Sequence, residues 1–79
     1  MSLKEEAFAV LDYMKNEEMK AYPCRHWASI WFYPERGVFL YADLILESKI
    51  FHFLKETDRI VFKGIESYQD EKMIRYTRK

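Results

Sequence analysis

The chain has 79 residues, about half the usual length of one domain, so we expect a single domain over residues 1–79. Thirteen basic residues balance thirteen acidic ones, and this neutral total argues against general nucleic-acid binding, which usually needs a basic excess. Aromatic residues make up 18% of the sequence and Gly and Pro number two each, a composition that argues against disorder and favours a packed core.

The first stretch of the chain is predicted to form a helix. Ser2 and Glu5 make a capping box, in which the Ser side chain caps the helix and Glu follows three positions later. Apolar residues then recur at helical spacing on one stripe, at Leu3, Ala7, Val10, Leu11 and Met14. The helix should end near Met19, ahead of Pro23, and its carboxylates, such as Glu17, are expected to lie in solvent.

Two runs of β-branched and aromatic residues, 26–33 and 38–43, predict a β-hairpin. The turn between them, 34–37, begins with Pro and ends with Gly, and both residue types favour turns. A loop of this length sets Tyr33 opposite Val38.

Alternation along this hairpin gives two faces, and both are largely apolar. One face carries Trp27, Ser29, Trp31, Tyr33, Val38, Leu40 and Ala42. The other carries His26, Ala28, Ile30, Phe32, Phe39 and Tyr41. An antiparallel sheet with one wet face should be polar on that face. The pattern therefore predicts that a partner covers one face, or that a helix packs on each face and leaves nothing exposed.

Helical spacing returns from Asp43 to Thr57, with Asp43 suited to cap the first turn. One stripe carries Leu46, Ile50, Phe53 and Leu54. A competing interpretation makes the segment from Ile50 to Leu54 a strand. The helix is favoured because the polar residues segregate to the opposite side with a period of about 3.6 residues.

Residues 59–68 and 72–79 are predicted to form two further strands, with Gly64 as a candidate β-bulge. The element order is then α-β-β-α-β-β, an α+β domain with a small antiparallel four-stranded sheet packed against two helices. The alternative is a winged-helix variant, in which 59–79 is the wing and 43–57 the recognition helix. It is weaker, because a hairpin stands where a winged helix normally has a second adjacent helix.

The sequence offers little support for metal binding or catalysis. Cys24 and His26 are two residues apart, but a structural zinc site normally needs four ligands, and no second close pair exists. We interpret Cys24 instead as a buried thiol next to a His at the start of a strand. No signature of a catalytic cysteine or of a glycine-rich phosphate loop is present. We expect no metal, no cofactor, no small-molecule substrate and no enzymatic activity.

A single Cys cannot form an internal disulfide, which suggests a reducing compartment. The N-terminus lacks a basic segment followed by an apolar run, as a signal peptide would have. No apolar run approaches the length of about 20 residues that a membrane helix requires. The expected location is cytoplasmic, with no membrane partner.

Contact with a protein partner explains the two-sided apolar hairpin best. Exposed contiguous aromatic surface usually marks an interaction site, and Trp and Tyr are typical interface anchors. We expect a non-enzymatic binding or regulatory module, such as an accessory or inhibitor protein, that acts on a protein partner or as a homodimer. The residues expected to contact the partner are Trp27, Trp31, Tyr33, Phe39 and Tyr41.

The alternative function is nucleic-acid binding by the C-terminal hairpin, 59–79. This segment carries six basic and three acidic residues, whereas residues 1–22 carry three basic and five acidic. Basic residues interleaved with aromatic ones suit phosphate contact and base stacking. The competing interpretation is a charged edge strand that avoids pairing with another sheet. The candidate contact residues are Arg36, Arg59, Lys63, Lys72, Arg75, Tyr76, Arg78 and Lys79.

Overall fold

The computed structural model describes residues 2–79, which form two helices and one five-stranded antiparallel sheet. The elements are α1 (Leu3–Glu18), β1 (Ser29–Tyr33), β2 (Val38–Tyr41), β3 (Leu44–Leu46), α2 (Ser48–Glu56), β4 (Ile60–Tyr68) and β5 (Glu71–Arg78). The strand order is β3-β2-β1-β5-β4. The α+β class is confirmed, but the sheet has five strands and not the predicted four. The C-terminal hairpin is not a separate wing, because β5 pairs with β1 inside the same sheet.

Helix α1 begins and ends as the sequence predicts. The Ser2 hydroxyl accepts a hydrogen bond from the backbone N–H of Glu5 at 3.2 Å, which satisfies one of the free donors of the first turn. The C-cap is Met19, and the chain then runs through turns and bends toward Pro23. Ala7 and Met14 are fully buried on the predicted apolar stripe.

The hairpin of β1 and β2 has the predicted register, with Tyr33 opposite Val38. Gly37 closes the turn with φ of 67°, a left-handed conformation that favours Gly. Strand β1 begins at Ser29 and not at His26, because residues 25–28 form a turn of their own.

The segment predicted as one helix over 43–57 instead contains a short strand followed by a shorter helix. Ala42 and Asp43 both have positive φ, at 52° and 66°, and form a tight turn that folds β3 back onto β2. Asp43 therefore does not cap α2; the N-cap is Glu47, whose side chain makes no capping bond. Leu46 and Leu54 are both buried in the main core, so a strand and a helix can share one apolar pattern. From Ile50 to Leu54, where a strand was the alternative, the helix is confirmed.

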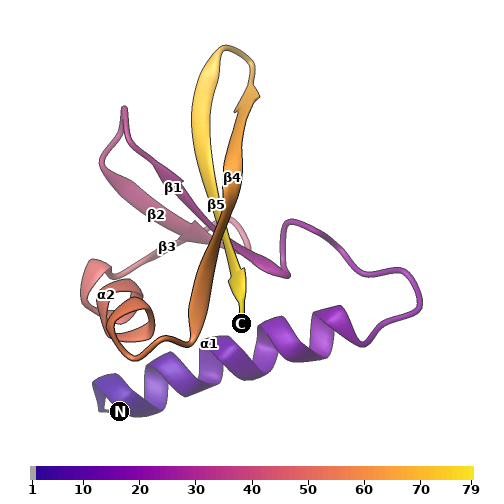
Figure 1. The fold of residues 1–79 in the computed structure, drawn as a ribbon, viewed down its shortest axis with the longest axis vertical. Helices are drawn as coiled ribbons and strands as arrows, with labels where there is room; N and C mark the ends of the chain where they lie inside the picture. The colour runs from indigo at the N-terminus through magenta and orange to yellow at the C-terminus, as the bar shows by residue number, and fades with distance from the viewer. Residues whose placement is uncertain (1) are drawn as a thin grey trace.

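Strands β4 and β5 form the longest hairpin of the sheet, and Figure 1 shows it projecting away from both helices. Its pairing slips between Phe62 and Gly64, which confirms the predicted bulge. Gly64 has φ of 150°, a value that L side chains rarely adopt.

Both helices pack on the same face of the sheet, the face that carries Ile30. Figure 1 shows α1 running across the base of the molecule with α2 beside it. The core between the helices and the sheet consists of Ala7, Met14, Ile30, Leu46, Ile50, Phe51, Leu54 and Ile60. The two helices therefore form one layer, and the alternative in which one helix packs on each face is wrong.

On the opposite face of the first hairpin, the chain segment that precedes β1 packs on Trp31. Trp31, Tyr33 and Met73 form a second buried cluster there. The His26 ring stacks on Trp31 with a centroid separation of 6.0 Å, and the Trp31 indole N–H donates to the His26 carbonyl at 3.3 Å. The Arg25 guanidinium lies 5.9 Å from the Trp31 ring. Arg25 and His26 of the connecting segment, and not a helix, therefore shield Trp31 on this second face.

Candidate functional site

An apolar groove of about 420 Å³ lies between α1, the segment before β1 and the two strands β2 and β3. We call it the α1–β3 groove. Its volume falls in the usual range of ligand sites, roughly 300–1,000 Å³. It is lined by Ala9, Val10, Tyr13, Trp27, Tyr41, Ala42, Leu44, Ile45 and Leu46.

The walls of the groove follow from local structure. Ala9 and Tyr13 are four residues apart on α1 and therefore share one helix face. Trp27 stands on the opposite side, in the turn before β1, and remains partly exposed. The tight turn at Ala42 folds β3 alongside the groove. Three separate segments of the chain thus contribute apolar side chains to one concave surface.

Strand β3 lies at the edge of the sheet and pairs only with β2. The outer backbone groups of an edge strand are free to pair with another chain. Leu44 and Ile45 on this strand are 72% and 75% exposed. A free backbone edge with exposed apolar side chains, beside an apolar groove, can accept an extended segment.

Tyr41, which lines the groove, carries a polar group that is itself buried. Its hydroxyl is buried and has no hydrogen-bond partner within residues 2–79. Burial raises the pKa of Tyr41 to about 12, with a smaller contribution from the negative charge of Glu17. The phenol therefore stays neutral at physiological pH.

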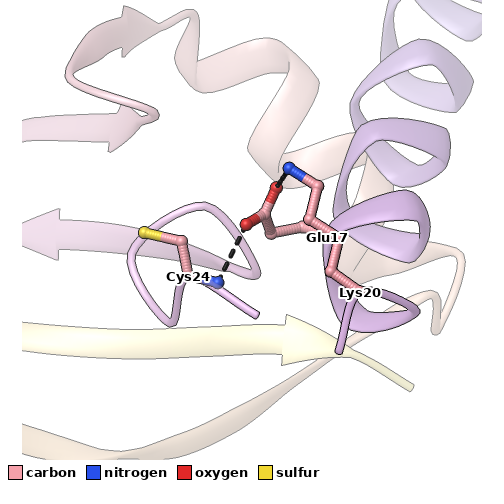
Figure 2. A network of polar contacts seen from close by, with 3 residues as sticks. All are labelled: Glu17, Lys20 and Cys24. Atoms are coloured by element: carbon pink, nitrogen blue, oxygen red, sulfur yellow. Dashed lines mark hydrogen bonds and ion pairs between the residues drawn. The ribbon is translucent and has the colours of Figure 1, made fainter. Parts of the chain in front are cut away.

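A buried carboxylate holds the segment that carries Trp27 against the end of α1 (Figure 2). One Glu17 oxygen accepts from the backbone N–H of Cys24 at 2.8 Å, and the other accepts from Lys20 Nζ at 2.7 Å. The hydrogen bond from Lys20, and then that from Cys24, lower the pKa of Glu17. The expectation that Glu17 lies in solvent was wrong. Its position three residues beyond Met14 on the apolar stripe was the signal that could have placed it.

A second contact ties this segment to the strands. His26 Nε2 and Asp43 Oδ1 lie 2.8 Å apart, which connects the segment to the turn between β2 and β3. Arg25 pairs with Glu66 on β4. The segment is therefore fixed at α1, at the β2–β3 turn and at β4, and Trp27 is positioned by all three.

The residues considered for metal binding are spread over separate parts of the fold. Cys24 is exposed, not buried as expected. His26 pairs with Asp43, while His52 lies on α2 and meets the Phe39 ring edge-on at 5.9 Å. Across residues 2–79, no three His, Cys, Asp or Glu side chains lie close enough together to hold a metal ion.

The aromatic residues predicted to contact a partner are divided between three environments. Trp27 and Tyr41 line the α1–β3 groove. Trp31 and Tyr33 are buried in the second cluster. Phe39 is half-buried and stacks on a Phe of α2 with centroids 4.2 Å apart. The exposed apolar residues Leu44 and Ile45 were missed, because the strand that carries them was predicted as helix.

The predicted nucleic-acid residues do not form one free basic surface. Four are paired with carboxylates of the same chain: Arg36 with Glu71, Arg75 with Glu66, Arg78 with Glu18 and Lys79 with Asp58. Arg59 lies 4.9 Å from the ring of Phe8, and Tyr76 packs against the main core. Lys63 and Lys72 are exposed and make no ion pair within the described part of the chain. Few cations are left free for phosphate contact.

No helix within the part of the chain that the structure describes is long and apolar enough to cross a membrane. Comparisons with protein-family models, with curated protein sequences and with solved structures found no match.

Proposed function

We propose that the chain is a non-enzymatic binding module that holds an extended segment of a partner protein in the α1–β3 groove. The observation that carries the proposal is the exposed apolar edge at Leu44 and Ile45, directly beside a groove walled by Trp27. Large apolar side chains are costly to leave in water, and Trp is a frequent interface anchor. An accessory or inhibitor role fits such a module.

The mode of binding that suits this surface is addition of a strand to the sheet. Backbone groups of the partner segment pair with the free edge of β3 and supply affinity. Side chains alternate along a strand, so every second side chain of the segment turns toward the groove. A groove of about 420 Å³ accommodates only a few such side chains, and the partner segment is therefore short.

The charges around the groove select a basic partner segment. Helix α1 carries five acidic and two basic residues. Of the acidic residues on α1, Glu5, Glu6 and Asp12 make no ion pair within residues 2–79. Strand β3 is bracketed by Asp43 and Glu47, which contact His26 and Lys49 but keep most of their side-chain surface exposed. Complementary charges speed association and exclude partners of the wrong sign. The expected occupant is an extended segment with alternating apolar residues flanked by Lys or Arg.

Selection from a displayed library of random peptides tests this proposal directly. Peptides selected on the intact chain should share alternating apolar residues with flanking basic ones. Their binding should weaken at least about tenfold in Trp27→Ala and in Ile45→Lys, since loss of an interface anchor costs about 1–2 kcal/mol or more. The matched control is Tyr22→Ala, an exposed aromatic residue that lies outside the groove and away from both sheet edges.

Two results would overturn the proposal. If the selected peptides bind Ile45→Lys as tightly as the original chain, the β3 edge is not part of the binding site. Selected peptides with acidic flanks would contradict the charge argument.

A further inference from the structure

We infer that the chain pairs with a second copy of itself through β4, along a two-fold axis at Ile65. Strand β4 forms the sheet edge opposite to β3 and pairs only with β5. It is nine residues long, and the apolar side chains beyond its first residue are exposed: Val61, Phe62, Ile65 and Tyr68. A long apolar edge of this kind is a pairing surface. The inference uses a different edge from the proposed function and is independent of it.

A row of apolar residues crosses the sheet and leads to Ile65. Phe39 on β2 lies opposite Phe32 on β1, Phe32 lies opposite Ile74 on β5, and Ile74 lies opposite Ile65 on β4. The first three are half-buried, whereas Ile65 at the edge is 58% exposed. A two-fold axis at Ile65 continues this row into the second copy and places the two Ile65 side chains together.

The charges of β4 are self-complementary when the strand pairs with itself in the antiparallel direction. Arg59 lies just before β4, Lys63 lies in its first half, and Asp70 follows its end. None of the three makes an ion pair within residues 2–79. The two-fold axis brings the basic end of one strand to the acidic end of the other. Opposite charges across an antiparallel pair stabilise it.

The β3 edge is not self-complementary in charge. A two-fold axis at Ile45 would place Asp43 of one copy opposite Glu47 of the other, and these carboxylates already contact His26 and Lys49 of their own chain, so the axis brings no unpaired opposite charges together. Self-pairing is therefore expected at β4, while β3 is left for a basic partner segment.

The bulge and the pleat fix the register of the dimer. The pairing of β4 leaves out the one residue between Phe62 and Gly64, which is the bulge. Pairing about Ile65 therefore sets Gly64 opposite Glu66 of the second copy and Phe62 opposite Ser67. Val61 then meets Tyr68, which buries two more exposed side chains. Each facing pair lies on one side of the sheet, as the alternation of a strand requires.

Sedimentation equilibrium over a concentration series tests the dimer. The intact chain should reach twice its monomer mass below about 1 mM, with roughly micromolar or weaker affinity expected of an interface made by one strand. Ile65→Lys should remain monomeric, whereas Ile45→Lys, the same change at the other edge, should dimerise like the original chain. Higher salt should weaken the association, because the charges at the interface are exposed.

Cross-linking tests the register without depending on a loss of binding. In a Cys24→Ser background, Ile65→Cys should form an intermolecular disulfide under mild oxidation, because facing residues of antiparallel strands have Cβ atoms about 4.5–5.5 Å apart. Ser67→Cys, two residues along the same face, should cross-link much less. A chain that stays monomeric up to about 1 mM, or equal cross-linking at both positions, would overturn the inference.

Discussion

The two tryptophans provide a direct test of how the first hairpin is covered. Trp31 is 4% exposed and lies in the second cluster, whereas Trp27 is 45% exposed at the groove. Trp31→Ala removes a buried aromatic side chain and leaves a cavity, a change that typically lowers the free energy of unfolding by about 3–5 kcal/mol. Trp27→Ala removes a side chain that is already half in water, and we expect a loss below about 1.5 kcal/mol.

Urea denaturation followed by circular dichroism measures this difference. The total stability of a small domain is about 5–15 kcal/mol, so Trp31→Ala should lose a large part of it. Because a loss of this size can leave Trp31→Ala partly unfolded in water, Trp31→Phe and Trp27→Phe supply a second measurement. Each of these keeps one indole, and acrylamide should quench the fluorescence of Trp27 far more than that of Trp31. Equal quenching, or equal losses of stability in the two Ala variants, would refute the assignment of Trp31 to a buried second face.

Three further predictions concern the core and the site. Met14→Ala should lower the free energy of unfolding by about 2–5 kcal/mol, whereas Met19→Ala, at an exposed position, should change it by less than about 0.5 kcal/mol in urea denaturation. Tyr41→Phe should leave stability unchanged or raise it by about 1 kcal/mol, because it removes a buried hydroxyl without a partner; a clear loss would reveal a hydrogen bond to that hydroxyl. The pKa of Glu17 is lowered by folding, so its carboxylate stabilises the fold above its ordinary pKa of 4.5 and loses this effect as the pH falls through the folded value. The stability difference between the original chain and Glu17→Gln should therefore be largest near neutral pH and shrink in acid, as thermal unfolding across pH would show.

Local signals in the sequence were sufficient for the parts of the fold that depend on neighbouring residues. The Ser2 cap and the apolar stripe to Met14 place α1, because both act within one or two turns of helix. The turn ending at Gly37 sets the register of β1 and β2, since a loop of fixed length permits one pairing. Gly64 marks the bulge, because its backbone conformation disfavours other residues.

The parts that depend on distant contacts were not visible in the sequence. Strand β3 has three residues, too few for a period of two to be distinguished from helical spacing, and Leu46 fits both patterns. The turn at Ala42 and Asp43 lacks Gly, so nothing marked it as a reversal. The position of Glu17 on the apolar stripe pointed to its burial, but its hydrogen bond to Cys24, seven residues away, is a tertiary contact that the stripe does not predict. The groove could not be predicted, because it requires both β3 and this anchored segment.

The central claim is that the free edge of β3 receives an extended partner segment. Amide hydrogen exchange of the intact chain, with and without a peptide selected on it, tests this claim most directly. Backbone amides of residues 44–46 that lie on the outer edge should exchange more slowly when the peptide is bound, because they then donate to the added strand. Unchanged exchange at 44–46 with new protection along β4 would contradict the claim and assign the site to the other edge.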